Sequence, residues 1–578
     1  MQYSGARILI ESLIEQGVDT VFGYPGGSVL FIYDELFKHK DRLRHVLTSH
    51  EQHAAHAADG YSRSTGKVGV CIATSGPGAT NLVTGIATAY MDSIPIVAIT
   101  GNVPTSLLGK DSFQEVDIAG VTMPIVKHNW IVKDVNELAE IVREAFIVAA
   151  SGRPGPVLID IPKDITAKLA EWNPASQHSP KASAADSANA PVALARANRL
   201  SARIAQHDVA DKDIAGAVEL LTSAKRPFIY AGGGVIISDA CKELTALVDR
   251  LNAPVALSLM GLGALPSTHP LNTGMIGMHG TVASNKAVQR ADLVVAIGAR
   301  FSDRVTSRAD QFAPGAKVLH IDIDPAEINK NVRSERWVLG DLKIVLKKIL
   351  EKLPNRIQTE WNGEVAEWKK QVPGAHSRTT PLHPRFVMEQ VAQRLGPEAV
   401  VATDVGQHQM WTAQFYPFAR ARALLSSGGL GTMGYGLGAA VGAKFGNPAR
   451  PVVLFTGDGS FRMNCGEMAT LNNYHQAILI VVLNNRVLGM VRQWQAMFYD
   501  ERYAETNLDR PPDFVKLADA YGLSGYRAKD ETTFLSSLDK ALKDIGAGKT
   551  ALIEALIDMD EQVLPMVPGG KPIDEQIL

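Results

Sequence analysis

The chain has 578 residues, of which 58 are lysine or arginine and 60 are aspartate or glutamate, so its net charge is −2. This balance gives no electrostatic reason to expect nucleic acid or an anionic membrane as a partner, and the length predicts several domains. Cys71, Cys241 and Cys465 are too scattered for a zinc site or a disulfide framework, which predicts a cytoplasmic location. The first residues show no signal peptide, and we expect no membrane span.

Short apolar runs alternate with helical patterns along the whole chain. They are VGVCIAT (68–74), IPIVAIT (94–100), GPVLIDIP (155–162), RPFIYAGG (226–233), ADLVVAIGA (291–299), KVLHIDID (317–324), PVVLFTGDG (451–459) and AILIVVLNN (477–485). Continuous runs of this kind suit strands covered on both faces, so the sequence predicts an α/β fold of three Rossmann-like parallel-sheet domains. The predicted boundaries are 1–170, an Ala/Ser-rich linker at 171–215, 216–350, a polar linker at 351–379, 380–560 and a tail at 561–578.

The first candidate site is SHEQHAAH, residues 49–56, which holds three histidines and a glutamate. A zinc-protease HExxH motif is absent because position 54 is alanine. His53 and His56 share a helix face, but no third metal ligand lies near them in the sequence. Two other interpretations remain: Glu51 is an acid–base group, or it is an ordinary acidic residue in the first turn of a helix, where it favours the helix dipole.

The second candidate site is the stretch 456–490, in which two strands end in polar residues. Asp458 supplies a charged oxygen at one strand end and Asn485 a neutral oxygen at the next, and Mg²⁺ prefers such ligands. Gly457 and Gly459 let the backbone approach phosphate oxygens. GDG alone is more often a simple turn. GDG followed by a helical pattern, a strand and NN resembles the diphosphate–Mg²⁺ motif of thiamine diphosphate (ThDP) enzymes.

That resemblance gives a role to Glu51. ThDP enzymes need a glutamate at the pyrimidine ring, in an apolar pocket that raises its pKa. Glu51 fits, because it follows a strand-like run and opens a helix of small residues. The histidines around it are then packing or helix-surface residues. The resemblance further implies that the carbonyl of Val487 is the third protein ligand of Mg²⁺, beside Asp458 and Asn485.

Many longer stretches resemble one family of ThDP enzymes, the catalytic subunits of acetohydroxyacid (acetolactate) synthase. Among them are GYPGGSVL, TSGPGATNLVTGIATAYMDSIP, DSFQEVD, SGRPGPVLIDIPKD, MGLGALP, GARFSDRVT, HIDIDPAEINK, GGLGTMGYG and LNNRVLGMVRQWQ. The resemblance implies a pyrimidine-binding first domain, a central FAD-binding domain and a diphosphate-binding third domain. It also implies a homodimer or higher oligomer, in which Glu51 of one chain faces Asp458 and Asn485 of the other.

The stretch GGLGTMG, residues 428–434, contains a formal GxGxxG, which alone weakly suggests a dinucleotide site. No strand runs directly into it, and the resemblance instead places Met433 under the bend of ThDP. The ThDP-binding residues implied in this way are Glu51, Val405, Gly406, Gln407, His408, Gly431, Met433, Gly457, Asp458, Gly459, Ser460, Asn485, Val487 and Met490.

The resemblance also implies an FAD site in the central domain, with Arg153 of the first domain as a further contact. Its residues are Arg153, Gly232, Gly233, Met260, Gly261, Leu262, Gly277, Met278, His279, Gly280, Arg300, Arg304, Asp322 and Asp324. Without the family context, the arginines are equally well explained as surface ion pairs, which contribute under about 1 kcal/mol each.

The family's reaction joins two 2-keto acids after one loses CO₂. Pyruvate is decarboxylated, and its two-carbon unit is transferred to a second pyruvate or to 2-ketobutyrate, as a step towards valine, leucine and isoleucine. Beside Glu51, the resemblance implies Gln114 at the site, Arg304 as a clamp for the acceptor carboxylate, and Trp494 as a pocket wall.

A regulatory small subunit is a further expected partner. The alternatives are another FAD- and ThDP-containing enzyme such as pyruvate oxidase, a nicotinamide-dependent dehydrogenase and a non-catalytic relative.

Overall fold

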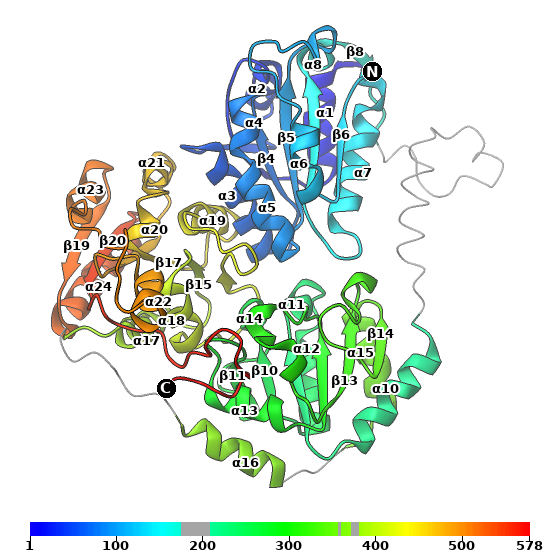
Figure 1. The fold of residues 1–578 in the computed structure, drawn as a ribbon. Helices are drawn as coiled ribbons and strands as arrows, with labels where there is room; N and C mark the ends of the chain where they lie inside the picture. The colour runs from blue at the N-terminus through cyan, green and yellow to red at the C-terminus, as the bar shows by residue number, and fades with distance from the viewer. Residues whose placement is uncertain (175–208, 356–359, 372–380) are drawn as a thin grey trace.

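The computed structural model describes residues 1–174, 209–355, 360–371 and 381–578. Three α/β domains follow one another along the chain, and they can be traced from blue through green to red in Figure 1. Each domain contains a six-stranded sheet in which every neighbouring pair of strands is parallel. The predicted fold class, three Rossmann-like parallel-sheet domains, is therefore confirmed.

The first domain has the strand order β3-β2-β4-β5-β7-β6, and its central strands are buried throughout. The strands are β2 (Thr20–Tyr24), β3 (Arg44–Leu47), β4 (Gly69–Ala73), β5 (Ile96–Asn102), β6 (His128–Ile131) and β7 (Val157–Pro162). The helices are α1 (Gly5–Glu15), α2 (Leu30–Lys38), α3 (Glu51–Thr65), α4 (Pro77–Asn81), α5 (Val83–Asp92), α6 (Ile118–Thr122), α7 (Leu138–Ala150) and α8 (Lys163–Ala167). An antiparallel pair, β1 (Gln2–Ser4) and β8 (Leu169–Glu171), joins the two ends of this domain.

The central domain has the strand order β11-β10-β9-β12-β13-β14. Its strands are β9 (Pro227–Ala231), β10 (Val255–Leu257), β11 (Asn272–Met275), β12 (Leu293–Ile297), β13 (Lys317–Asp322) and β14 (Arg336–Leu339). Its helices are α10 (Asp211–Ser223), α11 (Gly234–Ile237), α12 (Cys241–Leu251), α13 (Val282–Arg290), α14 (Asp303–Thr306), α15 (Leu342–Lys352) and α16 (Glu360–Lys369).

The third domain has the strand order β16-β15-β17-β18-β20-β19. Its strands are β15 (Val400–Thr403), β16 (Leu424–Leu425), β17 (Val452–Gly457), β18 (Leu479–Asn484), β19 (Ser524–Ala528) and β20 (Ala551–Leu556). Its helices are α17 (Pro384–Leu395), α18 (Gln407–Phe415), α19 (Gly436–Gly446), α20 (Asp458–Phe461), α21 (Met468–Asn473), α22 (Gly489–Phe498), α23 (Phe514–Ala520) and α24 (Glu531–Gly546).

The two faces of the third sheet pack against different neighbours. Val453 and Leu454 are adjacent on β17, so their side chains point to opposite faces. Val453 belongs to a core cluster shared with the central domain, whereas Leu454 belongs to a cluster shared with α3 and α19. Because parallel strands buried on both faces need covering layers on both sides, the third sheet holds the other two domains together.

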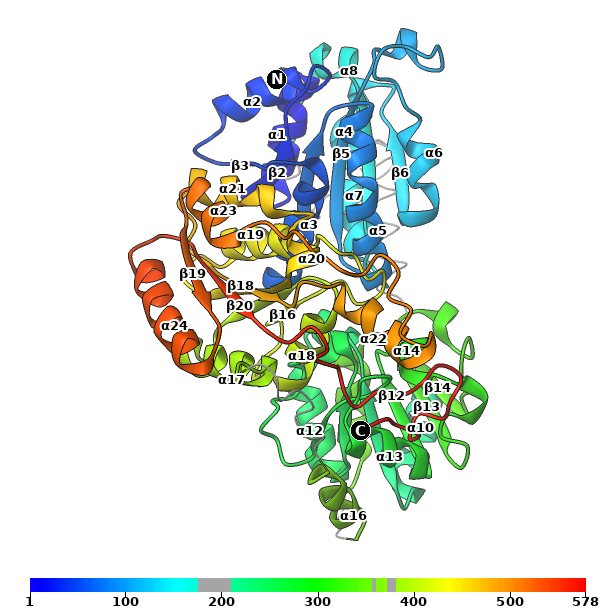
Figure 2. The ribbon, with the colours of Figure 1, turned by 60° about the vertical axis from the view of Figure 1, so that its left-hand side comes forward.

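Helices α3 and α19 cross with their backbones nearly in contact, between the first and third sheets in Figure 2. A Cβ atom built on Gly442 would lie 1.8 Å from the carbonyl oxygen of Ala57, and one built on Gly60 would lie 2.2 Å from that of Ala439. Glycine is therefore the residue that permits this approach. The small-residue run after Glu51 thus serves to dock the first domain on the third.

Both predicted linkers, 171–215 and 351–379, contain residues that the structure places in helices. Most of the predicted linker 171–215 lies outside the described residues, and α10 begins inside it, at Asp211. The range 351–379 contains α16, whose Trp361 is 3% exposed and donates a hydrogen bond from its indole N–H to the carbonyl of Pro227, at 3.0 Å. The described part of this range is thus packed on the central domain.

The C-terminal segment also packs on the central domain. The backbone N–H of Val567 donates to the carbonyl of Met278 (2.8 Å), and the side chain of Asn285 donates to the carbonyl of Ile573 (3.0 Å). Ile573 is fully buried.

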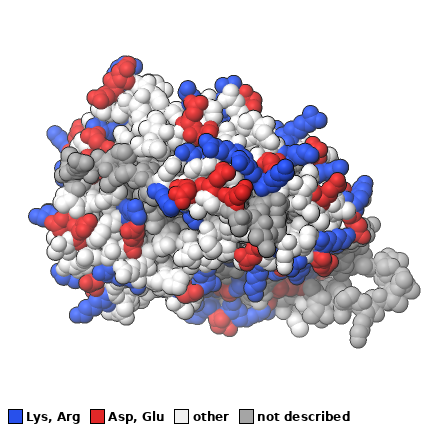
Figure 3. All heavy atoms as spheres, turned by 90° about the horizontal axis from the view of Figure 1, so that it is seen from below, with Lys and Arg blue, Asp and Glu red and all other residues white. Residues whose placement is uncertain are grey.

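On the face seen in Figure 3, basic and acidic side chains are interspersed. Among the described residues, no helix has the length and apolar character that a bilayer crossing requires.

Candidate active site

A small cavity of about 90 Å³ lies at the carboxyl ends of β15, β17 and β18. Parallel strands bring their carboxyl ends to one edge of a sheet, which is where ligands of such folds bind. Most of the residues implied for ThDP line this cavity: Val405, Gly406, Gln407, His408, Met433, Gly457, Asp458, Gly459, Ser460, Asn485, Val487 and Met490. The sequence did not single out four apolar neighbours and one glycine that also line it: Trp411, Leu483, Leu488, Gly489 and Val491.

Asp458 is the first residue of α20 and is only 1% exposed. Burial raises the pKa of its carboxyl to about 7, although hydrogen bonds from backbone N–H groups, including that of Arg486, oppose the shift. Its Oδ2 atom has no hydrogen-bond partner among the described residues. Arg462 contributes a nearby positive charge, but burial outweighs it, so the surroundings of the carboxylate fit a further cation.

Asn485 lies one residue beyond β18 and is 7% exposed. Its Oδ1 atom accepts a hydrogen bond from the backbone N–H of Val487 (3.2 Å), and its side-chain amide donates to Oε1 of Gln407 (3.2 Å). These bonds fix the amide, while the backbone bond from Arg486 to Asp458 joins the two strand ends. One carboxylate, one amide oxygen and a backbone carbonyl make the oxygen-rich set that Mg²⁺ prefers.

The backbone around the small cavity needs glycine at two positions. Gly431 and Gly434 have φ angles of 74° and 84°, in the left-handed region that other residues rarely adopt. The backbone N–H of Gly434 donates to Oγ of Ser460 (3.2 Å), so the loop that carries Met433 is tied to the GDG turn. The predicted phosphate cradle and the predicted Met433 therefore lie on one connected surface.

A second, larger cavity of about 1940 Å³ lies between the central domain and loops of the other two domains. Ordinary ligand pockets measure about 300–1,000 Å³, so this cavity has room for a dinucleotide. The residues implied for FAD that line it are Arg153, Gly232, Gly233, Met260, Met278, His279, Arg300, Arg304, Asp322 and Asp324. The other four, Gly261, Leu262, Gly277 and Gly280, are buried and do not line it.

Charged groups at the larger cavity come from two domains. Arg153 of the first domain pairs with Asp324 (3.1 Å) and Glu327 (2.7 Å) of the central domain. Asp322, at the end of β13, has its pKa raised to about 6 by burial. Arg304 is 64% exposed at its side chain and lies 3.8 Å from the carboxylate of Asp303, which is also exposed, so its guanidinium can reach an anion in the cavity. These residues fit the phosphates and hydroxyl groups of a nucleotide.

The two cavities share a wall. Val405, Gly406, Met490 and Val491 line both of them, and Gly431, implied for ThDP, lines the larger one. Trp494 lines the larger cavity from α22 and packs edge-on against Phe498, with ring centroids 5.5 Å apart. A group held in the small cavity therefore lies next to the space that Trp494 borders.

Glu51 and Gln114 line neither cavity. Glu51 opens α3 and accepts a hydrogen bond from the side chain of Asn81, at 3.0 Å. A Cβ atom built on Gly78 would lie 3.3 Å from the Glu51 carboxylate, and one built on Gly76 would lie 2.9 Å from the Cα of Gln114. Glu51 and Gln114 therefore flank one turn of the first domain.

The neighbouring histidines of α3 are buried packing residues. His53 donates a hydrogen bond from Nδ1 to the carboxylate of Glu467 (3.0 Å). His56 is fully buried, and burial lowers its pKa well below the usual value. The packing interpretation of these histidines therefore holds. No group of three or more metal-binding side chains occurs in the part of the chain that the structure describes.

Sequence reasoning did not single out Asp92, Ser258 and Gly298, which also line the larger cavity. Gly298 follows β12 with a φ of 56°, and its carbonyl lies 2.1 Å from the position of a Cβ built on Gly232. The sequence contains one indication of Gly298, because it lies at the end of the predicted strand, in the stretch AIGAR, residues 296–300. Asp92 had no local signal, because its role depends on a loop more than 300 residues away in the sequence.

Comparisons with known proteins agree with this geometry. Three models of thiamine pyrophosphate (TPP) enzymes match the chain: the N-terminal TPP binding domain at residues 3–121, the central domain at 214–349 and the C-terminal TPP binding domain at 404–555. Fold and site thus define a thiamine pyrophosphate enzyme.

Similar proteins span almost the whole chain. The acetolactate synthase large subunit of Cyanidium caldarium is 44% identical, over 98% of this chain and 95% of its own length. The acetolactate synthase of Mycobacterium leprae is 45% identical, over 99% and 90%. The acetolactate synthase isozyme 3 large subunit of Escherichia coli is 43% identical, over 100% and 98%. The chain belongs to the acetolactate synthase large subunits, which supports ThDP-dependent acetohydroxyacid synthase function and does not favour the oxidase alternative.

Replacing Asp458 by asparagine is predicted to stabilise the protein when no divalent cation is present. The Asp458 carboxyl has a pKa of about 7 in the folded protein and an ordinary pKa of about 4 in the unfolded chain, so folding takes up a proton between these pH values. The contribution of Asp458 to the free energy of unfolding therefore falls as the pH rises from about 4 to about 7. At pH 8 with a chelator, we expect Asp458→Asn to increase the free energy of unfolding by about 1–3 kcal/mol in urea titrations.

The cation dependence supplies the control for this prediction. Mg²⁺ should raise the unfolding midpoint of the unsubstituted protein and leave that of Asp458→Asn unchanged. The difference between the two proteins without cation should shrink at pH 5. An equal Mg²⁺ response in both proteins would contradict the assignment of Asp458 as a ligand.

Proposed function

We propose that the chain decarboxylates pyruvate and transfers the resulting two-carbon unit to a second 2-keto acid. Pyruvate as acceptor gives 2-acetolactate, and 2-ketobutyrate gives 2-aceto-2-hydroxybutyrate. The observation that carries the proposal is the buried carboxylate of Asp458. Its Oδ2 atom has no hydrogen-bond partner among the described residues, and the Arg486 backbone joins the carboxylate to the strand end that presents Asn485. The ordinary turn interpretation of GDG gives no reason for such a carboxylate.

Asp458, Asn485 and the carbonyl of Val487 would hold Mg²⁺, with diphosphate oxygens completing its shell. The orphaned Oδ2 atom of Asp458 supports this assignment. Bound ThDP supplies the nucleophilic carbon and the electron sink that loss of CO₂ from pyruvate requires. Met433, from the wall of the small cavity, would support the bend between the two rings of the coenzyme.

Glu51 would hold the proton that the pyrimidine ring of ThDP exchanges. In one chain, Glu51 lies outside both cavities, and residues 1–170 contribute nothing to the lining of the small cavity. A second copy of the chain would therefore have to bring its Glu51 to this cavity. This is the support for a homodimer as the smallest active unit, with one site at each end of the shared interface.

FAD would occupy the larger cavity and have a structural part, as the family resemblance implies. The size of the larger cavity and the neighbouring ends of strands β9 and β12 support this assignment.

Arg304 would clamp the carboxylate of the acceptor, because a planar guanidinium matches a carboxylate. A small regulatory subunit is a further proposed partner, since two of the relatives above are named large subunits. A cytoplasmic location is proposed on the sequence alone, because its three cysteines are scattered.

The direct test is an incubation with pyruvate, ThDP, Mg²⁺ and FAD, in which acetolactate is quantified. We expect acetolactate from the unsubstituted protein and roughly 100-fold less, or lower still, from Glu51→Ala and from Asp458→Ala. Oxygen uptake equal to the pyruvate consumed would contradict the proposal, because it would indicate an oxidase.

Trp494→Leu is predicted to lower the preference for 2-ketobutyrate over pyruvate as acceptor. Trp494 borders the space beside the small cavity, and the acceptors differ by one methylene, so the change should reach at most about tenfold in the product ratio. The matched control is Trp337→Leu, on β14 of the central domain, because Trp337 lines neither cavity. An unchanged product ratio in competition assays with both acceptors would refute the role of Trp494.

A further inference from the structure

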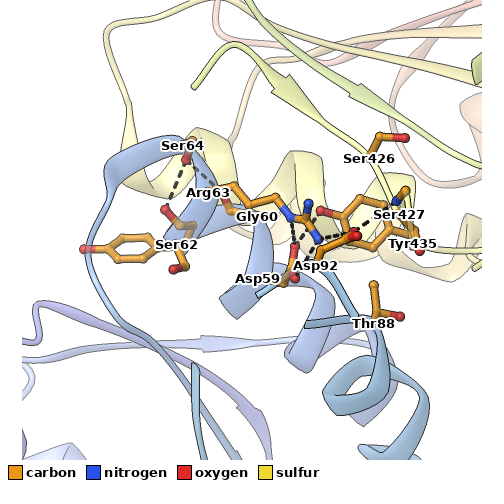
Figure 4. Close-up of polar contacts among 12 residues, drawn as sticks. Asp59, Gly60, Ser62, Arg63, Ser64, Thr88, Asp92, Ser426, Ser427 and Tyr435 are labelled. Atoms are coloured by element: carbon orange, nitrogen blue, oxygen red, sulfur yellow. Dashed lines mark hydrogen bonds and ion pairs between the residues drawn. The ribbon is translucent and has the colours of Figure 1, made fainter. Parts of the chain in front are cut away.

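A buried cluster of charges joins α3 to the end of α5. The guanidinium of Arg63 donates from Nε to Asp59 (2.6 Å), and from Nη2 to both Asp59 (3.2 Å) and Asp92 (2.9 Å). Tyr435 donates its hydroxyl to Asp59 at 2.6 Å. Figure 4 shows the guanidinium between the two carboxylates, beside the ring of Tyr435.

Asp92 uses its carboxylate to hold a loop of the third domain. Its Oδ2 atom accepts from the backbone N–H of Gly428 (3.0 Å), and its Oδ1 atom accepts from the N–H of Gly429 (2.7 Å). The side chains of Asp92 and Arg63 are 0% and 4% exposed. A Cβ atom on Gly429 would lie 2.9 Å from Asp92 Oδ1, so the approach is as close as glycine allows.

The remainder of the loop is held by weaker, neutral bonds. The hydroxyls of Thr88 and Thr432 bond to each other at 2.7 Å, and the backbone N–H of Thr432 donates to Ser427 Oγ at 3.0 Å. Bonds to a charged acceptor are roughly twice as strong as neutral ones. Asp92 is therefore the strongest single anchor that the first domain supplies to this loop.

The loop separates the two cavities. Gly428, Gly429 and Gly431 line the larger cavity, whereas Met433, a few residues on, lines the small one. Asp92 itself lines the larger cavity. A shift of the loop away from Asp92 would therefore move a wall of both cavities at once.

Stability alone gives little reason for this cluster. Two carboxylates share one guanidinium, and Arg63 Nη1 has no hydrogen-bond partner within the described residues. Burying such charges costs several kcal/mol per ion, and apolar side chains of similar shape are often as stabilising. The cluster does fix one geometry, because a guanidinium fork that bridges two carboxylates tolerates little displacement.

We propose that Asp92, oriented by Arg63, is the positioning residue of the Gly428–Gly431 loop, and that it couples FAD binding in the larger cavity to ThDP binding in the small one. The inference rests on the proposed function for the identity of the two ligands. The position of the loop, however, can be tested without either ligand.

The main test compares Asp92→Asn with the unsubstituted protein by flavin fluorescence and by ThDP titration with Mg²⁺. Loss of one charge-assisted bond should raise both dissociation constants about tenfold. The apparent KM for ThDP should rise in step, whereas kcat at saturating cofactors should fall by less than about threefold. Arg63→Lys keeps the charge and loses the fork, so its effect should be in the same direction and about threefold.

Asp292→Asn is the matched control. Asp292 accepts from two consecutive backbone N–H groups, those of Lys225 (2.6 Å) and Arg226 (2.8 Å), but it lines neither cavity. We expect its affinities for FAD and ThDP to stay within about twofold of those of the unsubstituted protein. An Asp292→Asn effect as large as that of Asp92→Asn would overturn the proposal, because the loss would then be a general effect of destabilisation.

Hydrogen–deuterium exchange without ligands tests the loop itself. Exchange at residues 426–434 should be faster in Asp92→Asn and in Arg63→Lys than in the unsubstituted protein and in Asp292→Asn. Unchanged exchange, or weaker binding of only one of the two ligands, would overturn the proposal. If the unsubstituted protein bound neither ligand, the proposed function would fail instead, and the exchange result would still decide the role of Asp92.

Discussion

The buried carboxylate of Asp458 is the interaction on which the account of this protein depends. Parallel strands with continuous apolar sequences need cover on both faces, and they present polar residues only at their ends. The third sheet follows this rule, and it leaves Asp458 and Asn485 at the ends of β17 and β18. Oδ2 of Asp458 has no hydrogen-bond partner in the described part of the chain, and burial raises the pKa of the carboxyl. The fold therefore accepts a cost that the proposed cation would offset.

The packing of the domains places Glu51 away from the small cavity of its own chain. Close contact between α3 and α19 fixes the first domain on the third, with Glu51 at the start of α3 and outside both cavities. The same crossing places the Asp59–Arg63–Asp92 cluster beside the loop between the cavities. One helix thus carries Glu51, proposed above for proton transfer, at its start, and further along it carries residues of the proposed anchor of a cofactor loop.

The sequence was most informative where the determinants are local. The apolar runs predicted the strands, and the polar residues after β17 and β18 predicted the small cavity. Ten of the fourteen residues that the family resemblance implies for FAD line the larger cavity, and the other four, Gly261 among them, are buried and do not line it. The burial of Trp361 and the role of Asp92 were not predictable, because each depends on a tertiary contact with a residue distant in the sequence.

The central claim is that Glu51 of one subunit completes the site that Asp458 begins in another. Complementation between Glu51→Ala and Asp458→Ala tests this claim most directly. In equal mixtures that exchange subunits, about half of the dimers are mixed, and each mixed dimer carries one intact site and one doubly altered site. The account predicts about a quarter of the activity of the unsubstituted protein. A mixture no more active than either variant alone, with subunit exchange demonstrated by tagged chains, would contradict it.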